Sequence, residues 1–214
     1  MTTLEFQPDL EAYEPSLVSA KDALTAFVSA CCSPLPVNRP AYDPFSQAIG
    51  EATNPKPGTW LTLAGVNGCG KTMLANQAYS YVSRHYPFAG SVWISGERGR
   101  LTSRRPKCVW IDEVSFSKRC KEGEYDLPEY LADDWLVVLD DLGASRDKSG
   151  FTGEMLFRLC NARIGKFTLF TTNLDLAGVS NQIDPRIASR LIRDGNEFKA
   201  ITAGDYSIRK RRTA

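Results

Sequence analysis

Short apolar runs alternate with longer segments of helical periodicity along most of this 214-residue chain. Five of the runs have the length of buried strands: residues 60–64, 109–111, 136–139, 167–171 and 198–202. Runs that are apolar without strict alternation are typical of strands covered on both faces of a parallel sheet. Strands that alternate with helical segments favour crossover connections. The pattern therefore predicts an α/β fold with a five-stranded parallel sheet.

The N-terminal part contains a predicted amphipathic helix. From Ser16, a candidate N-cap, apolar residues recur at intervals of three, four and seven, and the helix must end before Pro34. The apolar positions are Leu17, Ala20, Leu24, Phe27, Val28 and Cys31. This face either packs on the chain's own domain or docks another protein. The preceding residues, 1–15, are polar and are predicted to form a loose arm.

Two further segments surround the strand pattern. A stiff connector at 34–40 leads to a short predicted helix with Phe45, Ile49 and Ala52 on one side. An additional apolar run at 91–95 is joined to Val109 by a segment rich in glycine and arginine. We expect these two runs to pair as a hairpin inserted into the sheet architecture.

The residues between the first strand and the next helix read G-V-N-G-C-G-K-T and fit the phosphate-binding P-loop pattern. They are Gly65, Val66, Asn67, Gly68, Cys69, Gly70, Lys71 and Thr72. The glycines allow backbone N–H groups to approach phosphate oxygens, and the following helix presents its positive end to the same anion. Lys71 is expected to bind the β and γ phosphates and Thr72 to bind Mg²⁺. The motif predicts a nucleoside triphosphate as ligand.

Two acidic pairs compete for the position opposite the P-loop. An NTPase needs a carboxylate at the end of a neighbouring strand for the Mg²⁺ shell, and usually a second one to orient the attacking water. Asp112 and Glu113 follow a short run preceded by basic residues, whereas Asp140 and Asp141 follow four consecutive apolar residues. We favour Asp140 on Mg²⁺ and Asp141 on the water.

Asn173 ends the next predicted strand. An amide at the carboxyl edge of a strand beside a P-loop can hydrogen-bond the γ-phosphate or the attacking water. Asparagine after a strand is otherwise a common turn residue. The order of P-loop, Asp-Asp strand and Asn173 favours the functional interpretation.

Composition limits the remaining possibilities. Lys and Arg number 26 against 25 Asp and Glu, so global charge does not indicate a polyanionic partner. The six cysteines form no metal or disulfide spacing, which indicates a reduced, cytoplasmic compartment. No signal peptide is evident and no apolar run has the length of a membrane span.

Four segments together, G-V-N-G-C-G-K-T, L-V-V-L-D-D-L-G, L-F-T-T-N-L and D-P-R-I-A-S-R-L, resemble the AAA+ ATPases. Within these, the chain is similar to helicase loaders of the DnaC/DnaI type, including phage versions, and to the related IstB transposition ATPases. The resemblance covers roughly residues 40–208. It implies a three-layer P-loop NTPase (AAA+/ASCE) sandwich that hydrolyses ATP with Mg²⁺ at subunit interfaces, without a full C-terminal lid.

The resemblance also implies roles for individual residues. Asn173 matches the sensor-1 position, and Arg190 matches the arginine that enters a neighbouring subunit's ATP site, with Arg186 as the second candidate. A guanidinium supplied by another subunit makes hydrolysis depend on assembly. Without the resemblance, two arginines four residues apart would simply share an exposed helix face. The role of Arg209 stays open.

Basic residues cluster near the additional run, at Arg98, Arg100, Arg104, Arg105 and Lys107, with Trp93 and Trp110 on either side. Such a loop suits single-stranded DNA, since cations bind phosphates and aromatic rings stack on bases. The alternative is a solvated hairpin tip whose tryptophans belong to core strands.

The sequence thus divides into an N-terminal arm and helix at 1–40, an ATPase domain at 41–208 and a basic tail at 209–214. It favours an ATP-dependent loader or remodeller of a hexameric replicative DNA helicase that self-associates and contacts single-stranded DNA. The alternatives are an IstB-like transposition ATPase, a small P-loop kinase, and an adaptor that binds ATP with negligible hydrolysis.

Overall fold

The computed structural model describes residues 6–10, 14–33, 58–86, 92–95, 101–104, 106–145, 147 and 149–206, with 92–95 and 101–104 as backbone only. The short helix predicted around Phe45 lies outside these residues. So do Arg98, Arg100, Arg105 and the basic tail.

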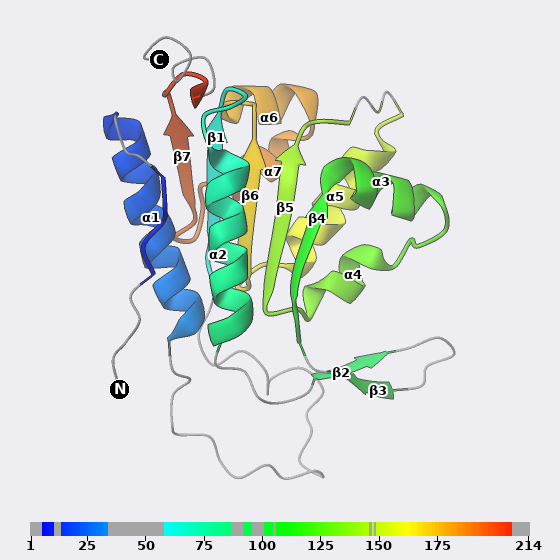
Figure 1. The fold of residues 1–214 in the computed structure, drawn as a ribbon. Helices are drawn as coiled ribbons and strands as arrows, with labels where there is room; N and C mark the ends of the chain where they lie inside the picture. The colour runs from blue at the N-terminus through cyan, green and yellow to red at the C-terminus, as the bar shows by residue number, and fades with distance from the viewer. Residues whose placement is uncertain are drawn as a thin grey trace.

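The predicted five-stranded sheet is present, and all of its strands run parallel in the order β4-β5-β6-β1-β7 (Figure 1). The strands are β1 (Trp60–Gly65), β4 (Cys108–Asp112), β5 (Leu136–Leu142), β6 (Phe167–Thr172) and β7 (Glu197–Ile201). The central strands β1, β5 and β6 are buried almost throughout, which explains their apolar runs. Their carboxyl ends meet at one edge of the sheet, so the residues that follow each strand are brought together there.

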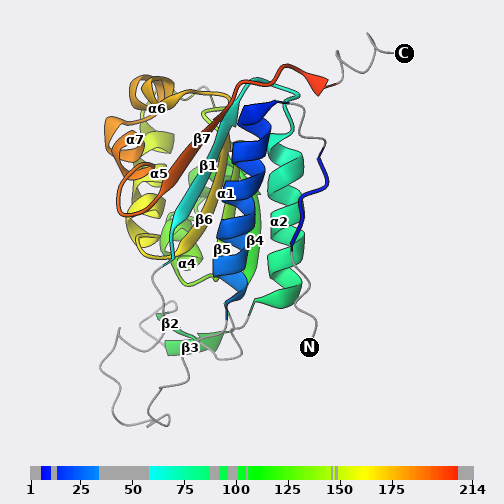
Figure 2. The same cartoon turned by 90° about the vertical axis from the view of Figure 1, so that its left-hand side faces the viewer.

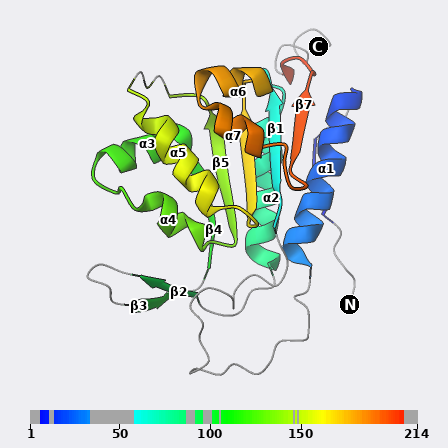
Figure 3. The same cartoon turned by 180° about the vertical axis from the view of Figure 1, so that it is seen from behind.

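Helices cover both faces of the sheet and complete the three layers (Figures 2 and 3). They are α1 (Pro15–Cys32), α2 (Lys71–His85), α3 (Glu113–Lys121), α4 (Leu127–Ala132), α5 (Phe151–Ala162), α6 (Leu176–Gln182) and α7 (Pro185–Arg190). The buried side chains of α1 and α2 form one core with one face of the sheet, and those of α3 to α7 form a second core with the other face. No helix within the described part of the chain is both long and apolar enough to cross a membrane.

Helix α1 packs on its own domain. All six predicted apolar positions are buried, and they lie against β7, α2 and β1. The helix begins at Pro15 with Glu14 as N-cap, so the prediction of Ser16 as N-cap is wrong; proline is well suited to the first helical turn. Ser16 instead accepts a hydrogen bond from the Thr202 amide at 3.2 Å. The apolar face is therefore not free to dock another protein.

The arm that precedes α1 is packed where the structure describes it. Phe6 and Leu10 are buried in the core with α1 and α2. The Asp9 backbone exchanges two hydrogen bonds with the side chain of Gln77 on α2, at 2.7 and 3.0 Å, and Lys21 donates to the Leu10 carbonyl at 2.7 Å. The prediction of a loose arm is thus wrong for residues 6–10, because two apolar residues among polar ones suffice to anchor them.

The additional run forms a hairpin, but with a different partner from the one expected. Strand β2 (Val92–Ser95) pairs antiparallel with β3 (Leu101–Arg104), which lies inside the arginine-rich segment. Val109 belongs to β4 of the main sheet. The expected pairing of 91–95 with Val109 is wrong, because β2 pairs with β3 and Val109 pairs with Val137 of β5.

Candidate functional site

The P-loop joins the end of β1 to the start of α2, as the motif requires. Gly68 and Gly70 have φ angles of +77° and +100°, a region that residues with a Cβ rarely adopt. Gly70 is also the N-cap of α2. The loop therefore directs the N-terminus of a 15-residue helix toward the carboxyl edge of the sheet, where backbone N–H groups and the helix dipole favour an anion.

Lys71 connects this loop to the end of β6. Its side chain is only 4% exposed, and its ammonium donates hydrogen bonds to the Val66 carbonyl and to Oδ1 of Asn173, each at 2.9 Å. Two residues that are 102 positions apart thus meet at the point predicted for the γ-phosphate. The structure brings Asn173 into the site, as the strand order requires.

Thr72 and Asp140 supply oxygen atoms suited to Mg²⁺. The Thr72 hydroxyl donates to Oδ1 of Asp140 at 3.1 Å, and Asp140 is 7% exposed at the end of the buried β5 run. Within the described residues no group of three or more His, Cys, Asp or Glu side chains could hold a metal by itself. A hydroxyl and one carboxylate fit Mg²⁺, which is usually bound by one or two carboxylates together with substrate phosphates and water.

A β-bulge sets the directions of the two adjacent aspartates. Between the pairs Leu139–Phe170 and Leu142–Thr172, the register shifts, so Asp140 and Asp141 face Thr171 alone. The buried Thr171 hydroxyl accepts from the Asp141 amide at 2.9 Å and donates to the Asp140 carboxylate. This role of Thr171 could not be predicted from the sequence, since a hydroxyl in a buried strand is its only signal.

Asp141 differs from its neighbour in exposure and in charge environment. Its backbone has φ = 55°, which is uncommon for a residue other than glycine, and the residue is exposed. Partial desolvation of the carboxyl group and then the Asp140 carboxylate raise the pKa of Asp141, against the opposing effect of Lys71. A carboxylate with these properties is suited to accept a hydrogen bond from water.

The competing pair, Asp112 and Glu113, lies beside the favoured one. Asp112 aligns with Asp140 in the pairing of β4 with β5, but its side chain caps α3 by accepting from the Ser115 amide at 2.8 Å. Glu113 is 2% exposed and accepts from the amides of Gly143 and Ser145 in the loop that follows β5. The two acidic pairs therefore differ in geometry: Asp140 contacts the P-loop, whereas Asp112 and Glu113 bind backbone amides.

Arg186 and Arg190 lie on α7, against the outer side of α5. Their guanidinium carbons lie 3.7 and 4.5 Å from the centre of the Phe157 ring. Arg186 forms ion pairs with Asp184 at 2.7 Å and Glu154 at 3.1 Å, and these two carboxylates raise its pKa. Arg190 donates to Oδ1 of Asn161 at 2.6 Å and contacts no carboxylate among its described hydrogen-bond partners.

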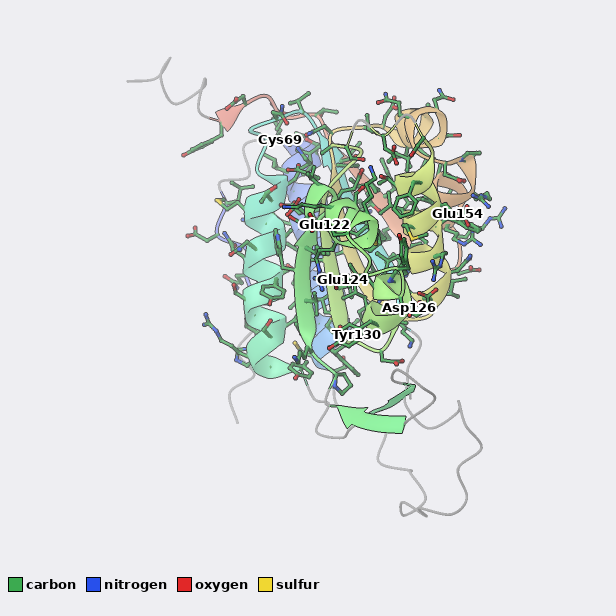
Figure 4. All side chains as sticks on the ribbon, turned by 90° about the vertical axis from the view of Figure 1, so that its right-hand side faces the viewer. Cys69, Glu122, Glu124, Asp126, Tyr130 and Glu154 are labelled. Atoms are coloured by element: carbon green, nitrogen blue, oxygen red, sulfur yellow. The ribbon has the colours of Figure 1, made fainter. Side chains whose placement is uncertain are left out.

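The arginine pair and the P-loop lie on opposite sides of the sheet. In Figure 4, Glu154, the partner of Arg186, is on the outer side of α5, whereas Cys69 of the P-loop is beside α2. The arginines line a hollow of about 590 Å³ together with Gly58 and Gly165, which precede β1 and β6. They are thus not brought into their own chain's P-loop site.

Within the predicted basic segment and its flanking tryptophans, the structure describes the side chains of Lys107 and Trp110. Lys107 is exposed, and its backbone amide donates to Asp134 at 3.0 Å. Trp110 is half-buried in β4 and packs edge-on against Tyr79, with ring centres 5.8 Å apart. Trp110 is therefore a partly buried strand residue that packs against the core on the α2 side of the sheet. The backbone of Arg104 lies in β3.

No family model matches the chain, and neither does any curated protein sequence. Solved structures do match. The DnaC helicase loader shares 21% sequence identity with a TM-score of 0.62, over 92% of this chain and 96% of that one. DnaI shares 19% identity with a TM-score of 0.59, over 92% and 87%.

The replication initiator DnaA, in a structure bound to AMPPCP and single-stranded DNA, shares 12% identity with a TM-score of 0.60. This match covers 94% of the present chain and 51% of the DnaA chain. The five-stranded parallel sheet, the P-loop and these neighbours give the chain a P-loop AAA+ fold like that of DnaC.

Proposed function

We propose that the chain binds and hydrolyses ATP at sites shared between copies, and that it uses this cycle to load or remodel a hexameric replicative DNA helicase on single-stranded DNA. The observation that supports hydrolysis is the meeting of four groups at one edge of the sheet. Direct hydrogen bonds join them in two pairs, Lys71 with Asn173 and Thr72 with Asp140.

Each group has a defined task in phosphoryl transfer to water. The P-loop amides and Lys71 bind the phosphate oxygens, and Thr72 with Asp140 holds Mg²⁺. When bound, this ion neutralises charge on the phosphates. Asp141 accepts a hydrogen bond from the attacking water, and Asn173 fixes the position of the water or the γ-phosphate. Further stabilisation of the charge that develops in the transition state is assigned to an arginine of another copy.

Arg190 is the residue proposed to supply that cation to a neighbouring copy. The other candidate arginine on α7, Arg186, already forms ion pairs with Asp184 and Glu154. The hydrogen-bond partners of Arg190 are neutral oxygens. An arginine supplied in trans contributes about 10³-fold or more to kcat. Hydrolysis is thus expected to rise with protein concentration as the copies assemble.

A mixing experiment tests the shared site. Asp141→Asn and Arg190→Ala should each abolish turnover alone. Mixed in equal amounts, they should recover activity, because about a quarter of randomly formed head-to-tail interfaces combine an intact Asp141 with an intact Arg190. An Arg190→Ala variant that turns over at the wild-type rate contradicts the trans role.

The helicase role is supported by the fold shared with the DnaC loader and DnaI. Capture of a replicative helicase should depend on ATP and should be lost in Lys71→Ala. ATP-dependent capture of a transposase without any helicase would favour the IstB-like alternative. Phosphorylation of a small metabolite that does not depend on protein concentration would favour a kinase.

A further inference from the structure

Glu113 is a buried acid that has no task in the reaction described above. It is the first residue of α3 and only 2% exposed. Burying a carboxylate is costly unless hydrogen bonds compensate for the lost water. The two carboxylate oxygens of Glu113 obtain this compensation from one short stretch of backbone, residues 143–145, through the amides of Gly143 and Ser145.

This stretch begins directly after the pair of aspartates. The Ala144 amide donates to the Asp141 carbonyl at 2.9 Å and closes a tight turn over residues 141–144. Gly143 in this turn has φ = +92°, and its Cα faces the side chain of Leu174, the residue after Asn173. The backbone that orients Asp141 is therefore held by Glu113 on one side and packed against the end of β6 on the other.

We propose that Glu113 is a positioning residue for hydrolysis, which fixes the 141–144 turn and so the direction of the Asp141 carboxylate. This inference rests on the proposed ATPase function. Thr171 binds the Asp141 amide from β6, and Glu113 binds the far end of the same turn from α3. Because both N–H bonds to Glu113 are made to a charged acceptor, they are stronger than bonds to a neutral amide would be.

A neutral replacement cannot reproduce both bonds. In Glu113→Gln, one oxygen is exchanged for an NH₂ group, which would face a backbone N–H that is also a donor. Glu113→Ala removes both acceptors. Neither change alters a group that contacts the P-loop, so nucleotide binding should persist while the reacting geometry is lost.

Asp147 offers a matched control. It is a second carboxylate that accepts backbone amides, from Ser149 and Thr152, and it anchors the loop before α5. It contacts none of the residues assigned to the reaction. Asp147→Ala therefore reports the effect of losing a second anchor of the same β5–α5 loop, at the end that leads into α5.

The test compares kcat, the Kd of a fluorescent ATP analogue and the melting temperature for the wild type, Glu113→Gln, Glu113→Ala and Asp147→Ala. In Glu113→Ala, kcat should fall on the order of 10²-fold, as expected for a displaced reacting group, with Kd changed by no more than about twofold. Glu113→Gln should be intermediate, and Asp147→Ala should keep kcat while lowering the melting temperature.

Wild-type kcat in both Glu113 variants would overturn this role and leave the ATPase intact. Equal losses of kcat and ATP binding, matched by Asp147→Ala, would reduce Glu113 to a stabilising contact. If Glu113→Ala does not fold, Glu113→Gln decides between these results. A wild-type protein without turnover would refute the ATPase and the role of Glu113 together.

Discussion

The hydroxyl of Thr171 accepts a hydrogen bond from the Asp141 amide at 2.9 Å, across a β-bulge that places two aspartates opposite this single threonine. Thr171→Val keeps the shape of the side chain and removes this bond together with the one that the hydroxyl donates to the Asp140 carboxylate. The loss should cost about 1–3 kcal/mol of unfolding free energy, because a partly buried N–H is left unpaired. It should also lower kcat, measured by phosphate release at saturating ATP.

Thr62 on β1 provides the control for this change. It is equally buried, but among the residues that the structure describes its hydroxyl has no hydrogen-bond partner. Thr62→Val should therefore leave the free energy of unfolding unchanged or raise it, and kcat should stay the same. If the two valine variants have the same free energy of unfolding and the same kcat, the hydrogen bond between Thr171 and the bulge contributes to neither stability nor turnover.

Asn173→Ala should separate catalysis from binding. The variant removes the amide oxygen that accepts from Lys71 at 2.9 Å, but it leaves the P-loop amides in place. We expect kcat to fall on the order of 10²-fold, because the reacting groups lose their alignment. The KM for ATP should change far less. A loss confined to KM would instead make Asn173 a binding residue.

Asp141→Asn should stabilise the protein while stopping turnover. Because the folded state raises the pKa of Asp141, ionisation of this carboxyl group opposes folding. This destabilisation is fully present above the pKa of Asp141 in the folded state. It is absent below the pKa in the unfolded state, 3.8. The variant should therefore melt at a higher temperature than the wild type at pH 7, with the difference vanishing below pH 3.8, as differential scanning calorimetry can measure. An unchanged melting temperature at pH 7 would show that ionisation of Asp141 does not oppose folding.

Arg163 should be a major determinant of stability. Its guanidinium is fully buried and donates to the carbonyls of Leu131, Ala132, Asp134 and Phe167, and burial lowers its pKa to about 10. Arg163→Met leaves these acceptors unpaired. It should lower the free energy of unfolding, measured with urea, by about 3 kcal/mol or more.

Arg158→Met is the matched surface change. Arg158 pairs with Glu129 at 2.8 Å, and both side chains are partly exposed. Such an exposed ion pair contributes about 0–1 kcal/mol to the free energy of unfolding. Equal effects of the Arg158 and Arg163 variants would show that the buried network adds nothing.

Leu10→Ala tests the packed segment that precedes α1. Leu10 is buried, and its side chain lies against Gly70 of the P-loop. Truncation should cost about 2–5 kcal/mol through the cavity it leaves. It should also weaken ATP binding, measured with a fluorescent analogue. Val18→Ala, at an exposed position of α1, should do neither.

Some features of this protein follow from local sequence. The P-loop, its flanking strand and helix and the five strands of the sheet could all be predicted, because glycine geometry and apolar runs act over a few residues. The order of the strands also explains why Asn173, Asp140 and the P-loop share one edge, since the carboxyl ends of parallel strands meet.

Other features depend on pairs of residues far apart in the chain. The bulge at Asp140 and Asp141 exists only in the register with β6, and the buried bonds from Glu113 need β4 to lie beside β5. The anchoring of residues 6–10 likewise depends on the surface of α2. By itself the sequence determined which groups are available for ATP chemistry. Only the tertiary structure decided which backbone amides and hydroxyls hold them in place, because such bonds depend on register and packing rather than on residue type.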